Sequence, residues 1–298
     1  MIKYNEYIGV DLSGGQLMAS QILFNKRVTE IKNFFTSTKL ELNKIPSSTQ
    51  LKTLTDKIFT GNNHQSKILV ALPNQSVVMR TIEVSSKIKQ PEKYIAAEIK
   101  SLLGTSESNF TTSWQWLKTT KNSPIKTALL VAAEQKIINE YIKNLQDNNL
   151  TPLSLEPAGV ALVRAVAYLT NHLPALQIAI YTRTSDTTVV IFDQESIYTS
   201  VIINTSLSDV KKNKNTLSVT HAALAQYEEF FGYFPKINYA WYAGENISVA
   251  NFKTTASKQL KIKFMPLPTT KLKFGQTVNK KNFFNEGLIA FGTALKFT

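Results

Sequence analysis

A turn near the start of the chain gathers residue types that can bind phosphate and a metal ion. An acid, a hydroxyl and three glycines lie close together there: Gly9, Asp11, Ser13, Gly14 and Gly15. The carboxylate of Asp11 could hold Mg²⁺ through water, and glycines, which lack a Cβ, let the backbone approach a phosphate closely. The same residues also suit an ordinary hairpin turn that follows a strand ending in an acid, so both interpretations stay open at this point.

Other chemistries find little support in the residue types. The chain has no cysteine, so it offers no disulfide and no thiolate nucleophile or metal ligand, which fits a reducing compartment such as the cytoplasm. His64, His172 and His221 are far apart and share no metal-ligand spacing with acids. Nucleophile-elbow, Walker A and dinucleotide-binding motifs are absent from the sequence. We therefore expect neither an ordinary hydrolase nor a dehydrogenase.

Length and composition indicate a globular protein with two domains. The 298 residues, 43% of them hydrophobic, can bury a sizeable core. No apolar run of signal-peptide length follows the N-terminus, and no stretch approaches 18 uninterrupted apolar residues. The longest apolar segment, residues 158–169, contains Arg164 and is typical of a buried helix. We expect no membrane-spanning segment.

The positive charge comes mostly from lysine. The formal net charge is +13, and only Arg27, Arg80, Arg164 and Arg183 interrupt a set of basic residues that is otherwise lysine. Only arginine offers the planar fork that favours bidentate recognition of bases and phosphates. The stretch from Lys253 to Lys296 is the most basic and contains a single acid, Glu286. We expect a solvated basic face and no nucleic-acid partner, with attraction to an anionic membrane leaflet as the alternative.

The predicted elements occur twice in the same order. Three short strands at residues 7–11, 15–23 and 27–35 would form an antiparallel meander, before a helix at 49–59 and an apolar strand at 67–72. The second half repeats this order with strands at 178–182, 187–192 and 197–203, a helix carrying Leu217, Leu224 and Phe231, and a strand at 239–242. The two copies begin about 170 residues apart, the length of one lobe. The pattern predicts two duplicated lobes.

Between the copies lies an insert of helices and strands. A helix opening at Pro91 carries Ile95, Ile99 and Leu102 on one face, and Trp114 and Trp116 alternate in a strand after it. A further strand at 127–133 and an apolar-striped helix at 137–145 follow, and a helix at 157–169 then carries the chain across to the second lobe. We predict packing of the two tryptophans inside the insert, with exposure in a binding groove as the alternative.

Four segments, in their order and spacing, resemble the PilM proteins of type IV pilus assembly and the related cytoplasmic part of GspL. They read YIGVDLSGGQLMASQI, VALPNQSVVMRTIEV, TALLVAAEQKIINEYIKNLQDNNLTPLSLEPAGVALVRA and NEGLIAFGTAL. The resemblance implies an α/β protein of the actin-like ATPase (ribonuclease H-like) fold, with two duplicated lobes and a β/α insert in lobe one. Lobe one would comprise residues 1–173, with the insert at about 85–150 and a closing helix at 284–298, and lobe two would comprise 174–283.

In that fold a nucleotide lies between the lobes, held by two hairpin turns and a glycine-rich loop. The resemblance therefore implies ATP and Mg²⁺ as cofactors, with Mg²⁺ held by Asp11 through water if ATP binds. The implied cofactor-binding residues are Gly9, Asp11, Ser13, Gly14 and Gly15 in the first turn, Arg183 and Ser185 in the second, and Gly244 and Glu245 in the loop.

The second turn departs from the pattern. It reads Tyr181-Thr182-Arg183-Thr184-Ser185-Asp186, without a glycine, so Arg183 could meet a phosphate but the backbone cradle is doubtful. Gln226 and Glu229 could reach a ribose or form an exposed helix face. We expect a degenerate site, with an active ATPase as the alternative.

Hydrolysis in this fold also needs a residue that orients water. The best candidate is Glu156, at the start of the crossing helix, although an acid is favoured at any helix N-terminus by the helix dipole. We therefore assign no catalytic residue and expect a scaffold that does not turn over ATP.

The resemblance also implies a partner. PilM proteins take up a short apolar N-terminal peptide of the inner-membrane protein PilN in a groove between the insert and the core of lobe one. The implied groove residues are Ile95, Ile99, Leu102, Trp116, Leu129 and Val131. The protein would then lie at the cytoplasmic face of the inner membrane, attached through this partner, with the pilus motor ATPase and further copies of itself as other contacts. Whether the machine builds pili, secretes proteins or takes up DNA stays open.

Overall fold

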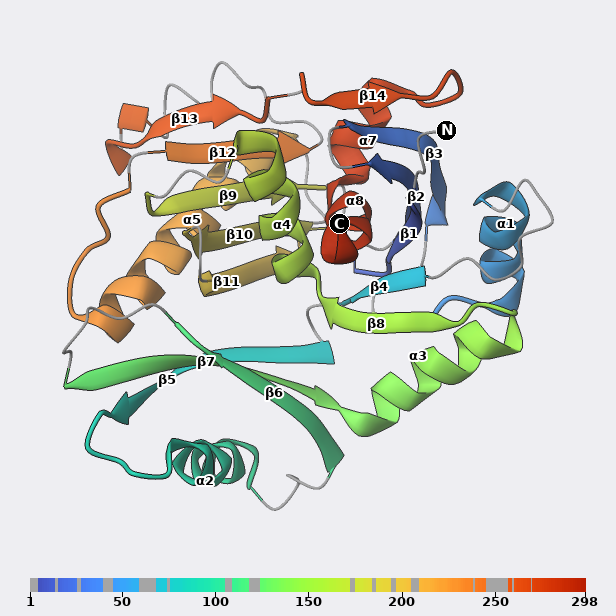
Figure 1. The fold of residues 1–298 in the computed structure, drawn as a ribbon. Helices are drawn as coiled ribbons and strands as arrows, with labels where there is room; N and C mark the ends of the chain where they lie inside the picture. The colour runs from blue at the N-terminus through green and yellow to red at the C-terminus, as the bar shows by residue number, and fades with distance from the viewer. Residues whose placement is uncertain are drawn as a thin grey trace.

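The structure is a computed structural model. It describes residues 5–13, 16–25, 28–39, 45–58, 68–73, 76–104, 109–117, 124–171, 175–183, 186–193, 197–204, 209–237, 239–244, 257–258, 260–268 and 270–298. Three sheets organise these residues (Figure 1).

The first sheet has six strands in the order β14-β3-β2-β1-β4-β8. Their bounds are β1 Asn5–Asp11, β2 Gln16–Asn25, β3 Val28–Lys39, β4 Ile68–Leu72, β8 Pro152–Pro157 and β14 Leu272–Phe274. β1, β2 and β3 form the predicted antiparallel meander, and β4 and β8 continue the sheet in parallel. Every residue of β4 is buried, as expected for a strand covered on both faces. We call this sheet and its helices lobe one.

The second sheet repeats the topology of the first. Its order is β11-β10-β9-β12-β13, with β9 Gln177–Thr182, β10 Asp186–Phe192, β11 Ile197–Asn204, β12 Tyr239–Gly244 and β13 Lys263–Pro266. Again a meander of three antiparallel strands is followed by two parallel ones. We call this sheet, with α5 (Asp209–Phe231), lobe two. The predicted duplication of a three-stranded meander, a helix and a following strand is confirmed; β8 and β13 form a further matching pair, and β14 has no counterpart in the second sheet.

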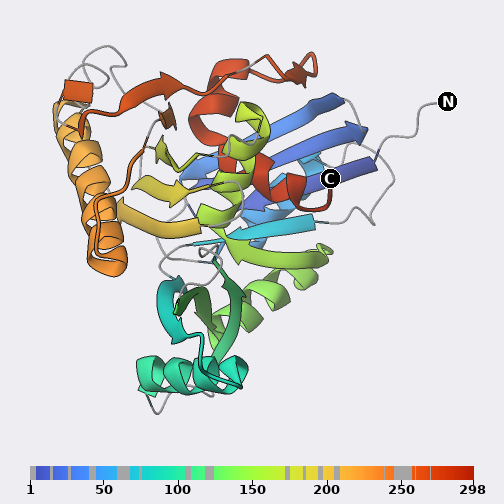
Figure 2. The same ribbon diagram turned by 60° about the vertical axis from the view of Figure 1, so that its left-hand side comes forward.

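The third sheet belongs to the insert. It has the order β5-β7-β6, with β5 Val77–Ser85, β6 Phe110–Trp116 and β7 Ile125–Glu134. Helix α2 (Pro91–Leu103) begins with a proline, which suits the first helical turn. Ile95 and Ile99 of α2 pack with Ile82, Val84 and Leu130 in a small core of their own. Figures 1 and 2 both show this unit below the two lobes.

The sheets place several boundaries differently from the sequence prediction. The three-stranded sheet runs from Val77 to Glu134, whereas the insert was predicted at about 85–150. Helix α3 (Gln135–Asp147) packs instead on lobe one, where Tyr141 and Leu145 share a core with α1 (Ser48–Ile58). β14 also pairs with β3 of lobe one, although residues up to 283 were expected in lobe two. The division into lobes otherwise stays a prediction.

Two helices fill the space between the large sheets. Helix α4 (Ala158–Thr170) packs against β9 and β10, and α8 (Leu288–Ala294) packs against β1 and α4 (Figure 1). The predicted closing helix is in fact α7 (Lys280–Glu286), α8 and a 3₁₀ turn at Leu295–Phe297, separated at Gly287. Among the described helices, none combines the length and the apolar character needed to cross a membrane.

Glycines allow α8 to approach its neighbours. A Cβ on Gly292 would lie 1.9 Å from the carbonyl oxygen of Ala161 in α4, and a Cβ on Gly9 would lie 1.9 Å from that of Ala290. Both distances are well inside van der Waals contact, so the close packing of α8 on α4 and β1 depends on the missing side chains. Gly9 therefore has a packing role whether or not a ligand binds nearby.

Tyr141 should make the free energy of unfolding decrease as the pH rises into the alkaline range. Burial, with the charge of Glu140 adding to it, raises the pKa of Tyr141 to about 12 from an ordinary 10.0. Because the folded state disfavours the phenolate, this stabilisation is complete below about pH 10 and is lost as the pH rises toward 12. Between about pH 9 and about pH 11 we expect the wild type to lose roughly 1 kcal/mol more stability than Tyr141→Phe in urea unfolding. Equal losses in the two proteins would contradict the burial of the hydroxyl.

Candidate functional site

The corresponding strands β1 and β9 of the two lobes end facing each other. β1 ends at Asp11, and β9 ends at Thr182, directly before Arg183. The backbone N–H of Arg183 donates to the carbonyl of Asp186 at 2.8 Å, which closes the β9–β10 turn and places both side chains at the same end of lobe two. The duplicated topology thus brings an acid of lobe one opposite a base of lobe two.

Arg183 bridges the two lobes. Its Nη1 donates to Asp11 Oδ2 at 2.8 Å, its Nη2 donates to Asp186 Oδ2 at 2.8 Å and to Ser13 Oγ at 3.1 Å, and its Nε donates to Asp186 Oδ1 at 3.1 Å. Ser13 in turn donates its hydroxyl to Asp11 Oδ1 at 2.5 Å and its backbone N–H to the same oxygen at 2.8 Å. Asp11, Arg183 and Asp186 are exposed by 0%, 2% and 1%. The predicted phosphate turns therefore hold a buried ion-pair network.

Charge pairing within this network outweighs the cost of burying its arginine. Burial by itself would lower the pKa of Arg183, but the charges of Asp186 and Asp11 outweigh it and raise that pKa above its ordinary value. The guanidinium neutralises Asp11, which is what Mg²⁺ would do in a nucleotide complex. With two carboxylates and one guanidinium, the network carries a net negative charge, which disfavours a triphosphate.

The site therefore does not fit Mg²⁺-ATP as it stands. The Asp11 carboxylate is engaged by Ser13 and Arg183, so it has no free oxygen directed at a hydrated ion. Across the described parts of the chain, no group of three or more His, Cys, Asp or Glu residues could hold a metal ion. His221 is exposed on α5, while His64 and His172 lie outside the described residues. ATP and Mg²⁺ binding stays a prediction that this arrangement argues against.

The remaining predicted cofactor residues fall into two groups. Gly244 ends β12 with φ of 113°, and a Cβ there would lie 1.9 Å from the carbonyl oxygen of Thr182. The close approach of β12 to β9 thus requires this glycine, and this packing explains it without a role in binding adenosine. The others, Gly14, Gly15, Ser185 and Glu245, lie outside the described residues.

Glu156 lies at the junction of β8, α4 and α8. Arg164 of α4 donates from Nη1 and Nη2 to the two carboxylate oxygens of Glu156, at 2.6 and 2.8 Å, and from Nη1 to the Gly292 carbonyl at 2.8 Å. Lys296 adds an ion pair at 3.6 Å. Both oxygens of Glu156 are thus occupied by structural partners. Within the described part of the chain, no hydrogen bond joins Glu156 to Asp11 or Arg183.

Sequence reasoning missed the pairing of Arg183 with Asp11. It treated the arginine as a possible phosphate ligand, because the turn was compared with nucleotide-binding turns. The available signal was an acid and a base at the equivalent turns of two duplicated lobes, where the fold must place them opposite each other.

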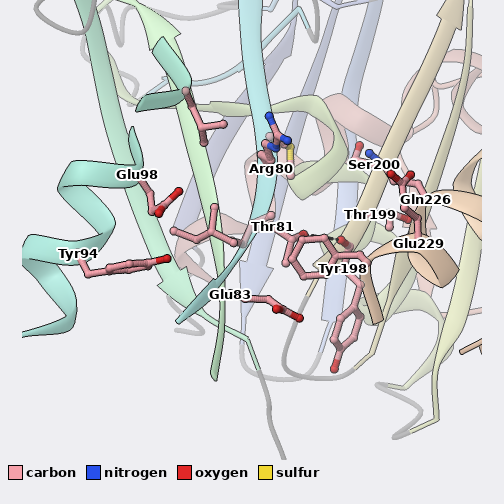
Figure 3. Close-up of a pocket in the computed structure, with 15 residues that line it drawn as sticks. Arg80, Thr81, Glu83, Tyr94, Glu98, Tyr198, Thr199, Ser200, Gln226 and Glu229 are labelled. Atoms are coloured by element: carbon pink, nitrogen blue, oxygen red, sulfur yellow. Dashed lines mark hydrogen bonds between the residues drawn. The ribbon is translucent and has the colours of Figure 1, made fainter. Parts of the chain in front are cut away.

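A second candidate site is a cavity of about 530 Å³ between the insert and lobe two. Residues of β5, α2 and β7 line one side, and residues of β11 and α5 line the other (Figure 3). Of the predicted groove residues, Leu102 and Leu129 line this cavity. Gln226 and Glu229, considered as ribose contacts, line it too.

The other predicted groove residues lie elsewhere. Ile95 and Ile99 belong to the core of the insert, and Val131 packs on the core of lobe one. Trp116 is 37% exposed on β6, where its ring lies 5.2 Å from that of Trp114 in an edge-to-face contact. The structure thus brings two of the six groove candidates together at one cavity, and lobe two supplies its opposite wall.

Comparison with known proteins shows the fold. Neither a protein-family model nor a curated protein sequence matches the chain. Among solved structures, the PilM–PilN type IV pilus biogenesis complex contains a chain that is 14% identical, with 98% of each chain covered and a TM-score of 0.72. The cytoplasmic domain of EpsL, an inner-membrane component of the type II secretion system of Vibrio cholerae, is 11% identical, with 93% of this chain and 88% of that one covered and a TM-score of 0.52. The chain therefore adopts, over nearly its full length, the fold of these two proteins, which is the actin-like ATPase fold that the sequence resemblance predicted.

Proposed function

We propose that this protein is a scaffold in the inner-membrane assembly platform of a type IV pilus or of a related secretion or DNA-uptake machine. The likeness to the chain solved in the PilM–PilN complex, which covers 98% of both chains, supports this role. By the same likeness, the protein would bind the N-terminal cytoplasmic tail of a PilN-like protein. That tail would hold it at the cytoplasmic face of the inner membrane, where the pilus motor ATPase and other copies of the chain could contact it.

The single observation that favours a scaffold function over an ATPase function is the buried ion pairing of Arg183. Its guanidinium lies between Asp11 and Asp186, at the turns where an active relative would hold phosphates and Mg²⁺. If the protein were an ATPase, each ATP molecule would have to displace the buried ion pair between Arg183 and Asp11 before it could bind. Breaking such a pair leaves uncompensated charge in the interior and is strongly unfavourable.

The partner groove is proposed on the insert. Leu102 and Leu129 are its best-placed residues because they line a cavity that is open to a ligand. Trp116 could extend the groove along β6, since its indole is partly exposed. Ile95 and Ile99 would support the groove from the insert core and would not contact the tail directly.

Titration calorimetry distinguishes the scaffold from an active ATPase of the same fold. The purified protein is titrated with Mg-ATP and, separately, with a peptide of the N-terminal tail of the PilN-like protein encoded in the same gene cluster. We expect binding of the peptide and no binding of Mg-ATP below about 1 mM. Asp11→Asn is the comparison variant, once circular dichroism shows that it is folded: its peptide curve should match that of the wild type, because Asp11 does not line the insert cavity.

The opposite pattern would favour the rival function. Mg-ATP binding that Asp11→Asn abolishes, without any peptide signal, would favour a nucleotide-driven protein, and release of phosphate from ATP would then distinguish an ATPase from binding without turnover. In that case Arg183 must leave Asp11 when ATP enters, and the lobes must separate at this contact.

A further inference from the structure

The cavity between the insert and lobe two concentrates negative charge in a strongly basic protein. Glu83 of β5, Glu98 of α2 and Glu229 of α5 line it from three different elements, and Arg80 is the single base among its lining residues that the structure describes. The whole chain has 34 basic and 21 acidic residues, so the cavity opposes the charge of the molecule as a whole. Carboxylates converging from separate elements raise the local concentration of cations.

One of these carboxylates is held in place. The hydroxyl of Tyr94 hydrogen-bonds to Glu98, one turn further along α2, and this bond raises the pKa of Tyr94. Figure 3 shows both side chains extending from α2 toward β5, with Glu83 on that strand and Glu229 on the far side of the cavity. The acids therefore face a common space from opposite walls.

A buried hydroxyl on the lobe-two wall lacks a partner. Thr199 of β11 is 6% exposed and lines the cavity, and its Oγ1 has no hydrogen-bond partner within the described part of the chain. It lies on the α5 side of β11, because the next residue, Ser200, packs on the opposite side against Gly159 of α4. Buried hydroxyls are nearly always hydrogen-bonded, and an unsatisfied one is costly. Thr199 can therefore accept from, or donate to, a ligand in the cavity.

The two strands that flank the cavity are both sheet edges. β5 is the outermost strand of the insert sheet and β11 is the outermost strand of the lobe-two sheet. A hydrogen bond of 3.1 Å from Thr81 Oγ1 to the Tyr198 carbonyl joins them. An outermost strand presents backbone N–H and C=O groups that can pair with an added extended peptide. The cavity is thus suited to a peptide segment in extended conformation.

The apolar residues of the cavity suit the same kind of occupant. Leu102 and Leu129 line it together with Met79 and Phe230, so alternate side chains of an extended segment can be buried on an apolar floor while others reach the acids. A volume of about 530 Å³ lies in the range of sites that bury most of a short ligand.

We propose that this cavity binds an extended, apolar peptide segment that places a lysine or arginine side chain among Glu83, Glu98 and Glu229. The inference rests on the proposed function, because it takes this segment to be the tail of the PilN-like partner. It adds that the tail must carry a positively charged residue at this cavity. Arg80, on the same cavity, repels a basic residue placed one strand position away and so helps to fix the register of the segment. Thr199 supplies a further hydrogen bond on the lobe-two side.

Three matched peptides test the charge requirement. An acetylated and amidated host peptide of alternating valine and serine carries lysine, norleucine or glutamate at its centre, and binding to the full chain is measured by fluorescence anisotropy. Norleucine keeps the length of lysine and removes the ammonium group. We expect the lysine peptide to bind about tenfold more tightly than the norleucine peptide, and the glutamate peptide to bind most weakly.

Protein variants locate the effect. In the double variant Glu83→Gln/Glu229→Gln, the preference for lysine over norleucine should fall to about twofold or less, while Glu92→Gln, an exposed acid of α2 outside the cavity, should leave it unchanged. Both cavity glutamates are exposed, so their replacement should preserve the fold. Equal affinity for lysine and norleucine, unchanged selectivity in the double variant, or no binding by any peptide up to about 1 mM would overturn the proposal.

A parallel titration separates this inference from the proposed function. The tail peptide of the PilN-like protein is titrated into the wild type and into the double variant. Equal affinity for both proteins refutes the cationic cavity and leaves the scaffold standing. If the tail fails to bind the wild type while the lysine peptide still binds through the acids, the cavity stands and the partner is wrong. Spermidine that displaces the lysine peptide at equal concentration would indicate a site for free polyamines and would also overturn the proposal.

Discussion

Replacing Arg183 by methionine should lower the free energy of unfolding by about 3–5 kcal/mol, because it leaves Asp11 and Asp186 buried without a counter-charge. The methionine side chain keeps much of the volume, so the loss reports charge and hydrogen bonding more than a cavity. Urea unfolding followed by circular dichroism gives the difference.

A second variant tests the cause of that loss. In Asp11→Asn/Arg183→Met/Asp186→Asn all three charges are removed, and most of the lost stability should return, since uncharged replacements of a whole buried network are often tolerated. Arg80→Met is the matched control: it removes an exposed arginine and should change stability by no more than about 0.5 kcal/mol. A wild-type-like Arg183→Met would show that the guanidinium does not hold the lobes together in solution.

Gly292→Ala should also cost about 3 kcal/mol, because its Cβ would meet the Ala161 carbonyl oxygen at 1.9 Å. The clash is with backbone in the middle of α4, which no side-chain rotation can relieve. Helices α4 and α8 must therefore move apart at the centre of the molecule. Thermal unfolding by calorimetry measures the effect.

Gly104→Ala is the control for that substitution. Gly104 has φ of 63° and ψ of −143°, but nothing lies within 4 Å of its would-be Cβ, so alanine there meets no steric clash and should cost only the backbone strain of that conformation, roughly 1 to 2 kcal/mol. If the two alanine variants are equally stable, the close approach of α8 to α4 is not needed for folding.

Most of the architecture could be predicted from local patterns. Short apolar strands separated by turn residues occur twice in the same order, and this repetition predicts the two sheets that the structure shows. β8 was missed because its six residues begin and end with proline, which is uncommon within a sheet. β14, with three residues, is too short to produce a periodic signal.

The sites were less predictable because they depend on contacts between distant residues. Arg183 and Asp11 are separated by 172 positions, and neither residue alone indicates whether it meets phosphate or carboxylate. In the insert, the sequence placed Ile99 and Leu102 on the same apolar helix, but only packing decides that the first is buried in the insert core and that the second lines a cavity. The acids of that cavity come from elements up to about 146 positions apart (Glu83 to Glu229).

The bridge between Asp11 and Arg183 also bears on what the protein can sense. Because the cation is part of the chain, its effective concentration beside Asp11 is set by the fold and not by any pool of free ligand in the cell. If Mg-ATP does not displace Arg183, as we propose, closure of the two lobes at this contact does not depend on the cellular ratio of ATP to ADP. In the proposed scaffold, one shape would then persist through changes of energy supply, and the proteins that bind it would set the timing of assembly.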